Sequence, residues 1–236
     1  MDLQICSTKE EVAQNFALYL EHFIKHKDIV HMALSGGSTP KIVFDELSNT
    51  NKYKINWTKV HLYWGDERCV PPTDDESNYK MTVAHLLENI EIPKRNIHRI
   101  LGENDPVKEA VRYGDLLTKN LPNQQKIPVF DMVILGMGED GHTASIFPYE
   151  IELWDSKKTC EVAIHPESGQ KRITITGKVI NQSEWVIFLV TGAGKKDKLA
   201  EIIHKKGDYK NYPASLVKPL SGNLVWYLDT EAAAKL

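Results

Sequence analysis

The sequence predicts an α/β fold with a doubly wound, mostly parallel sheet and helices on both faces. Short apolar segments alternate along the chain with longer segments of helical periodicity, which is the pattern of a parallel sheet. One apolar segment, "VFDMVIL" at residues 129–135, is almost continuous, as in strands buried on both faces. Four loops rich in glycine and charge each follow a predicted strand, at the edge where such sheets bind ligands.

The individual elements follow from periodicity and capping. Residues 7–26 begin with a Ser-Thr cap and acidic residues, and Val12, Phe16 and Leu20 recur at helical spacing. The same criteria predict strands at residues 29–34, 59–64, 129–135, 171–177, 185–192 and 224–229, and helices at 40–49, 77–90, 109–121 and 195–206.

Composition restricts the class of protein. The net charge of -3 over 236 residues argues against nucleic acid or an acidic membrane as the main partner. No apolar run approaches the ~18 residues of a membrane span, and the amino terminus does not resemble a secretory signal. Cys6, Cys69 and Cys160 are scattered, so we expect free thiols in a reducing cytoplasm, with Cys69 a candidate reactive thiol beside a charged motif.

The first of the four loops, "SGGSTP", is a candidate phosphate cradle. Gly36 and Gly37 permit close backbone approach, and Ser38 and Thr39 offer hydroxyl groups before a helix predicted to have Pro40 near its first position. The amides and the positive end of the helix dipole favour an anion. A plain strand-to-helix turn explains the same residues. Neither a Walker A motif nor GxGxxG is present, which disfavours nucleotides.

Two further loops supply cations. Arg68, in "GDER", is suited to a bidentate phosphate contact or to stabilising an oxyanion, although an ion pair with Asp66 or Glu67 is the simpler interpretation. Lys195 and Lys196 begin a helix, where their charges oppose the helix dipole unless an anion lies between them. A solvated lysine pair remains the alternative.

The segment that follows "GDER" is acidic. Asp74, Asp75 and Glu76 lack the spacing of a calcium loop and are predicted to form a solvated turn. Ser77 and Asn78 are predicted to cap the next helix, and either could also face the site.

The loop "GMGEDGH" is the candidate catalytic segment. Glu139, Asp140 and His142 are too few and too poorly spaced for a convincing metal site. A histidine with an unperturbed pKa of about 6.5 can exchange protons at neutral pH, and Asp140 could orient it. Because no GxSxG elbow is present, His142 acting as a general base on water is simpler than a covalent intermediate. A histidine that only bonds within the turn is the alternative.

Taken together and in order, "SGGSTP", "GDERCVPPTDDESN", "LGMGEDGHTASIFP", "RITIT" and "VTGAGKKDKL" resemble the 6-phosphogluconolactonase family over roughly residues 34–229. The resemblance implies a single domain over residues 1–236 and the fold of glucosamine-6-phosphate deaminase. It also implies hydrolysis of the small-molecule sugar-phosphate lactone 6-phosphoglucono-δ-lactone to 6-phosphogluconate in the pentose phosphate pathway, without metal or cofactor.

The resemblance assigns roles to particular residues. His142 would activate water as the general base, and Asp140 would position it or the substrate. Asp66 falls near an acid of the deaminase relatives, with no defined role here. The 6-phosphate would be held by Gly36, Gly37, Ser38 and Thr39 together with Arg68 and Lys195.

Two alternatives remain from the sequence. Deaminase relatives carry a "FNEP"-like segment after their "DGH" and a "MDEY"-like segment, whereas this chain has "TASIFP" and "GDER", which favours the lactonase. A sugar-phosphate sensor without activity is the third hypothesis, disfavoured by the intact Asp140 and His142 pair. The sequence does not indicate an oligomeric state.

Overall fold

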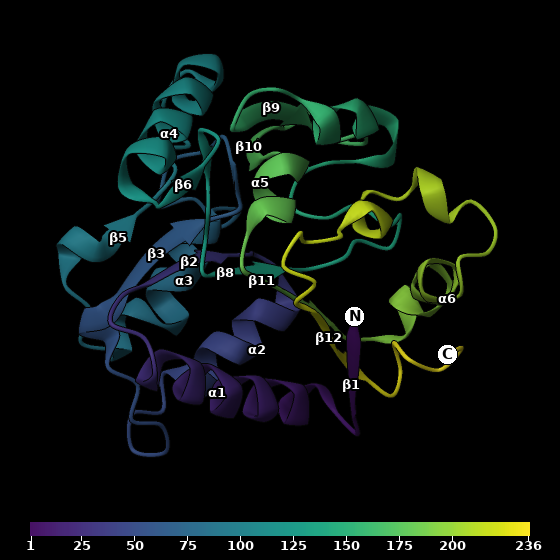
Figure 1. Cartoon of the computed structure of the whole chain (residues 1–236), viewed down its shortest axis with the longest axis horizontal. Helices are drawn as coiled ribbons and strands as arrows, with labels where there is room; N and C mark the ends of the chain where they lie inside the picture. The colour runs from purple at the N-terminus through teal and green to yellow at the C-terminus, as the bar shows by residue number, and fades with distance from the viewer.

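A seven-stranded sheet forms the centre of the computed structural model, which describes residues 1–236 (Figure 1). All six strand pairings in this sheet are parallel, as predicted. In spatial order the strands are β1 (Asp2–Cys6), β12 (Leu224–Asp229), β11 (Trp185–Val190), β8 (Met132–Leu135), β2 (Val30–Leu34), β3 (Val60–Trp64) and β5 (Ile97–His98).

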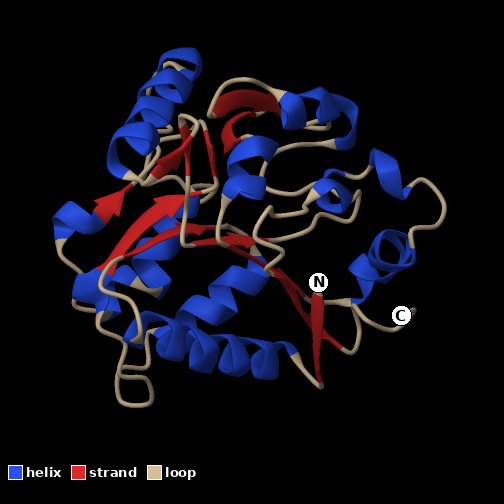
Figure 2. Cartoon of the chain, viewed as in Figure 1, coloured by secondary structure: helices blue, strands red, loops and turns tan.

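Helices cover both faces of the sheet, with α1, α2 and α3 on one side and α4 and α5 on the other (Figure 2). This is the doubly wound arrangement that the alternating pattern predicts. The α-helices are α1 (Lys9–Lys25), α2 (Ser38–Leu47), α3 (Asn78–His85), α4 (Pro106–Asn120), α5 (Gly177–Gln182) and α6 (Lys196–His204). Short 3-10 helices are η1 (Trp57–Lys59), η2 (Leu87–Asn89), η3 (Lys94–Asn96), η4 (Pro148–Asp155), η5 (Ala193–Lys195), η6 (Tyr209–Asn211) and η7 (Pro213–Leu216).

A second, antiparallel sheet corrects one sequence expectation. The strand predicted at residues 171–177 is β10 (Lys171–Ile175), and it pairs with β9 (Cys160–Ile164) and β4 (Asp66–Arg68) instead of joining the main sheet. Part of the "GDER" loop is therefore a strand. Local pattern identifies an extended segment but does not say which partner it will meet. A small hairpin, β6 (Asn123–Gln124) with β7 (Ile127–Pro128), completes the strands.

Two helix boundaries also differ from the sequence expectation. The helix predicted over residues 77–90 ends at His85, because Leu86 leaves helical geometry with φ -134° and is buried in the core. Helix α2 begins at Ser38, so Pro40 is its third residue and Gly37, with φ 106°, precedes it. Strands β1, β4, β5, β6, β7 and β9 and helix α5 were not predicted.

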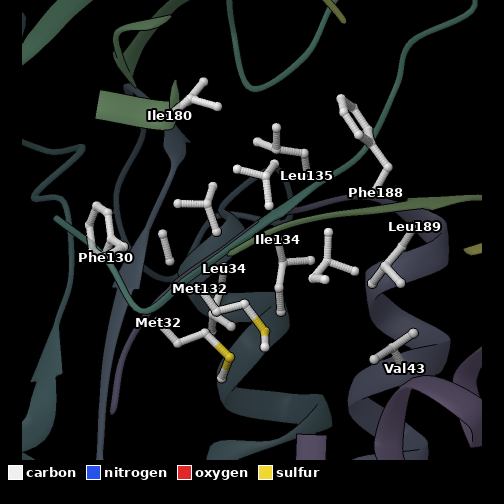
Figure 3. Packing of buried hydrophobic residues seen from close by; sticks show 14 of the residues in the cluster. Met32, Leu34, Val43, Phe130, Met132, Ile134, Leu135, Ile180, Phe188 and Leu189 are labelled. Carbon is white, nitrogen blue, oxygen red and sulfur yellow. The ribbon is translucent and has the colours of Figure 1, made fainter. Parts of the chain in front are cut away.

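The hydrophobic core lies on both faces of the central strands (Figure 3). Met132 and Ile134 of β8 pack in the same cluster as Met32 of β2. Val43 of α2 closes one side of this layer and Ile180 of α5 closes the other. Burying each such side chain contributes about 1.5–3 kcal/mol relative to exposure, so the core fixes the strands that carry the loops.

The order of the strands creates a switch point between β2 and β8. The chain runs from β2 outward to β3 and β5 and then returns to β8 on the other side of β2. Ligands bind beyond the carboxyl ends of strands at such a point, which is where the sequence predicts the site. No helix combines the length and apolar character that crossing a membrane would require.

Candidate active site

A cavity of about 200 Å³ opens at the carboxyl ends of β2, β8 and β11. Its lining includes eight of the nine residues that the sequence predicts for the site; the ninth, Asp140, contacts it through His142. The eight are Gly36, Gly37, Ser38, Thr39, Asp66, Arg68, His142 and Lys195.

The start of α2 forms one end of the cavity. Gly37 adopts a φ of 106°, which favours glycine and turns the chain from β2 into the helix. The first-turn N–H groups have no intrahelical acceptor, and no side chain caps the helix. Thr39 Oγ1 lies 2.7 Å from Thr191 Oγ1 and ties this turn to the loop after β11. These features suit an anion at the helix terminus.

Gly36 is required by its contact with α3. A Cβ atom at this position would lie 1.8 Å from Oδ1 of Asn78, so only glycine permits this approach. The Asn78 Nδ2 donates a hydrogen bond to the backbone oxygen of Asp66 at 3.0 Å. Ser77 caps α3, as predicted, by accepting from the N–H of Lys80 at 3.1 Å. Asn78 lines the cavity, so the segment both caps the helix and faces the site.

Asp66 contributes a buried carboxylate to the wall of the cavity. It is 5% exposed, and its Oδ2 accepts a hydrogen bond of 2.6 Å from Ser145 Oγ. Ser145 lies in the "TASIFP" segment and was not identified from the sequence as a contact of Asp66. The bond leaves Oδ1 of Asp66 without a protein partner.

Two arginines face each other across the antiparallel pair of β4 and β10. Arg68 and Arg172 are directly paired in register, and neither forms an ion pair. The expected ion pair of Arg68 with Asp66 or Glu67 is thus absent. Nε of Arg68 is buried without a partner, and the Arg172 guanidinium lies 5.6 Å from the centre of the Phe147 ring.

This arrangement favours an anionic ligand. Burial lowers the pKa of Arg172, Asp66 raises it, and the neighbouring charge of Arg68 lowers it further. Like charges directly opposite in a sheet are destabilising, and an anion between them relieves the repulsion. Sequence reasoning missed Arg172, although it opens the motif "RITIT", in which no other residue is charged.

Lys195 supplies a third cation from the loop after β11. It is the last residue of η5 and lines the cavity. Gly192, with φ 93°, allows the turn out of β11, and its N–H donates to both carboxylate oxygens of Asp229 at 3.0 Å. This anchoring holds the loop that presents Lys195.

His142 and Asp140 form a hydrogen-bonded pair. His142 Nδ1 lies 2.6 Å from Asp140 Oδ1, and the backbone N–H of His142 donates to the same oxygen at 3.0 Å. Burial raises the pKa of Asp140, but the hydrogen bond and charge of His142 outweigh it, so the pKa is lowered overall. An ionised carboxylate only accepts, so Nδ1 carries the proton and Nε2, which makes no hydrogen bond, is free to accept one.

The glycines of this loop have steric roles. A Cβ on Gly138 would lie 2.1 Å from His142 Nδ1 and 2.5 Å from Asp140 Oδ1. The Gly138 N–H donates to the backbone oxygen of His142 at 2.9 Å, closing the turn. Gly141 has φ 85° and packs against Tyr212. The loop therefore forms a tight turn around His142. The centre of the imidazole ring lies 4.7 Å from the centre of the Phe147 ring.

Other candidate chemistry receives less support. No three His, Cys, Asp or Glu side chains are grouped so that they could hold a metal ion. Burial raises the pKa of the Cys69 thiol to about 11, which disfavours a reactive thiolate there.

Comparison with known proteins places these features in a family. The model of the family described as glucosamine-6-phosphate isomerases/6-phosphogluconolactonase matches residues 7–226. The chain is 45% identical to 6-phosphogluconolactonase of Haemophilus influenzae over 96% of its own length and 94% of the relative. It is 45% identical to that of Treponema pallidum over 76% and 74% of the two chains.

Solved structures agree with this placement. The crystal structure of the devB protein matches with a TM-score of 0.94 and 41% identity, covering 100% of this chain and 99% of the other. The 6-phosphogluconolactonase of Trypanosoma brucei matches with a TM-score of 0.87 and 29% identity over 100% and 98%. A monomeric glucosamine-6-phosphate deaminase, 20% identical over 100% of both chains with a TM-score of 0.86, shares the fold. The chain therefore belongs to the glucosamine-6-phosphate isomerase/6-phosphogluconolactonase family.

Proposed function

We propose that this chain, as a single domain over residues 1–236, is a cytoplasmic 6-phosphogluconolactonase of the pentose phosphate pathway. It would hydrolyse 6-phosphoglucono-δ-lactone to 6-phosphogluconate. The observation that carries the proposal is the free Nε2 of His142, backed by Asp140, in a cavity whose other end is an anion cradle. Close relatives named 6-phosphogluconolactonase support the same reaction.

Binding of the phosphate would fix the orientation of the lactone. The first-turn amides of α2 after Gly37, the hydroxyls of Ser38 and Thr39, and the amino group of Lys195 surround one end of the cavity. Because the phosphate is remote from the reacting carbon, these contacts act on rate through positioning.

The reaction would proceed by direct attack of water. Nε2 of His142 takes a proton from water as the water oxygen bonds to the lactone carbonyl carbon. Asp140 stabilises the imidazolium that forms. Arg68 and Arg172, which both line the cavity, would stabilise the negative charge that develops on the carbonyl oxygen. The bond from this carbon to the ring oxygen then breaks, and the imidazolium returns its proton to that oxygen, giving the hydroxy acid.

Deamination of glucosamine 6-phosphate is the second candidate. It shares the fold, but here the segment after His142 is "TASIFP", without an acid. Ser145 in that segment is used to hold Asp66 in the cavity wall. Lactone hydrolysis needs one base and a fixed set of binding groups. The contact between Ser145 and Asp66 helps to fix those groups, and it therefore supports the lactonase.

The two reactions are separated by assaying both. The protein should accelerate loss of freshly prepared 6-phosphogluconolactone above the spontaneous rate and release no ammonia from glucosamine 6-phosphate. Removing the base in His142→Asn should lower kcat by at least about 10²-fold while 6-phosphogluconate still binds. His165→Asn is the control, because His165 packs on Phe147 but does not line the cavity. Absence of lactone acceleration by the wild-type protein would refute the proposal.

A further inference from the structure

Glu67 is a buried carboxylate beside the cavity that the proposed mechanism does not use. It lies in β4, is 2% exposed, and pairs with no lysine, arginine or histidine. Its Oε1 accepts from the backbone N–H groups of Arg68 and Asn78, each at 2.8 Å. Its Oε2 accepts from the Tyr79 N–H at 2.8 Å and from Ser77 Oγ at 3.0 Å.

We infer that Glu67 is a positioning residue of the active site, which acts on the substrate through Arg68 and Asn78. An ionised carboxylate offers about four acceptor positions, and here all four are filled. Three of the donors are rigid backbone groups, two of them at the positive end of α3. Burial raises the pKa of Glu67 and these backbone hydrogen bonds lower it, with burial the larger effect, so the pKa is raised overall. The inference rests on the proposed function only in naming the substrate.

The residues that Glu67 holds line the cavity from two different elements, β4 and α3. Arg68 and Asn78 line it directly. Asn78 also bonds the backbone oxygen of Asp66 and abuts Gly36, whose missing Cβ leaves room for it. One carboxylate therefore sets the spacing between β4, the start of α3 and the loop after β2. A change at Glu67 would move a binding arginine and the cradle together.

Replacement by glutamine disturbs this arrangement without changing the size of the side chain. Each carboxylate oxygen accepts from at least one backbone N–H, from Arg68 and Asn78 on one side and from Tyr79 on the other. Whichever way the amide of Glu67→Gln is turned, its NH₂ group faces a backbone donor. One buried N–H or two are then left unsatisfied, depending on the orientation, and the turn between β4 and α3 must shift.

Glu109 provides a matched control for a purely structural role. It is 0% exposed and accepts from the Leu101 N–H at 2.7 Å, from Asn104 Nδ2 at 3.1 Å and from Arg112 Nε at 2.7 Å. None of these residues lines the cavity. Glu109→Gln should therefore lower the melting temperature while kcat and KM, measured well below that temperature, stay within about twofold of wild type.

The decisive comparison is made in folded protein at a temperature below both transitions. Glu67→Gln should lower kcat/KM for the lactone by about 10-fold or more, since displacements of about 1 Å in a site have large kinetic effects. It should also weaken binding of 6-phosphogluconate in calorimetry, a readout independent of turnover. If Glu67→Gln instead behaves like Glu109→Gln, with lower stability and unchanged kinetics and binding, the inference is overturned.

Coupling to Arg68 tests the route of action. In an Arg68→Ala background the further effect of Glu67→Gln on kcat/KM and on 6-phosphogluconate affinity should shrink to about threefold or less. Full additivity would contradict action through Arg68. If Glu67→Gln fails to fold, Glu67→Asp takes its place, because it keeps the charge but is too short to satisfy all four donors. If the wild-type protein were inactive on the lactone, only the proposed function would be refuted. The comparison of 6-phosphogluconate binding by Glu67→Gln and Glu109→Gln would still decide the role of Glu67.

Discussion

At the scale of single residues, the position of the catalytic imidazole depends on the absence of a side chain at Gly138. In Gly138→Ala, the added Cβ would lie 2.1 Å from His142 Nδ1, so the ring and its bond to Asp140 must shift. We expect kcat to fall by about 10²-fold, with little change in the affinity for 6-phosphogluconate. Steady-state kinetics and calorimetry measure the two quantities.

A second glycine gives the control for this substitution. Gly114 lies inside α4, away from the cavity, and a Cβ there would make only an ordinary contact of 3.4 Å with Thr159. Gly114→Ala should keep full turnover and gain some helix stability. Equal kinetics for Gly138→Ala and Gly114→Ala would show that the imidazole is not held by the turn.

At the scale of elements, the pairing of β4 with β10 brings two arginines together at a cost in stability. Replacing one of them in Arg172→Met should raise the melting temperature slightly, because the repulsion with Arg68 is removed. The same change should weaken binding of 6-phosphogluconate and lower kcat for the lactone by about 10-fold or more, since a charge-assisted contact to the developing oxyanion is lost. Thermal unfolding measures the change in melting temperature, and calorimetry on the same preparation measures the change in affinity for 6-phosphogluconate. A stable variant with unchanged affinity would exclude Arg172 from the site.

The same pair of strands shows where sequence reasoning succeeds and fails. The strands of the main sheet and the loops that follow them were predictable, because buried parallel strands have continuous apolar patterns and Gly-rich turns mark their ends. His142, Asp140 and Gly36 belong to such loops and are where the sequence places them. Arg172 was missed because its place in the wall depends on pairing with a segment more than 100 residues earlier, which no local pattern records.

Polar contacts across the fold were missed for a related reason. Ser145 owes its role to one hydrogen bond with Asp66, and Glu67 owes its role to several hydrogen bonds with the start of α3, so both depend on partners on other elements. Their sequence neighbours carry no sign of these bonds, since serine and glutamate are as common in solvated turns. Such residues become visible only when burial and partners are known together.

At the scale of the whole molecule, three histidines in adjacent strands make stability depend on pH. His31, His61 and His98 lie on β2, β3 and β5, with ring centres 5.1 and 5.4 Å apart along the row. Burial lowers the pKa of all three, that of His98 to about 4; neighbouring imidazoles lower the pKa values of His31 and His98 further, and Arg95 lowers that of His61. Asp131 acts in the opposite direction on His31.

The sign of the effect follows from these lowered values. In the unfolded chain the same imidazoles bind protons below about pH 6.5, whereas the folded protein resists protonation until the pH is much lower. The free energy of unfolding should therefore be retained above about pH 6.5 and fall as the pH decreases towards about 4. Denaturation midpoints measured between these values should decline less steeply in His98→Asn. An exposed histidine at the end of α6 supplies the control His204→Asn, and an equal slope in all three proteins would contradict the expectation.

The edge formed by β1 and β12 has a consequence for how the molecule is made. Asp2 pairs with Val225 and Cys6 with Asp229, so β1 leaves the ribosome well before its partner β12, which lies more than 200 residues later in the chain. Throughout synthesis of the intervening chain, β1 has no place in the sheet. Of the strand pairs in this fold, the pair of β1 and β12 has the longest loop to close, and β1 is therefore the last of these strands to find its neighbour.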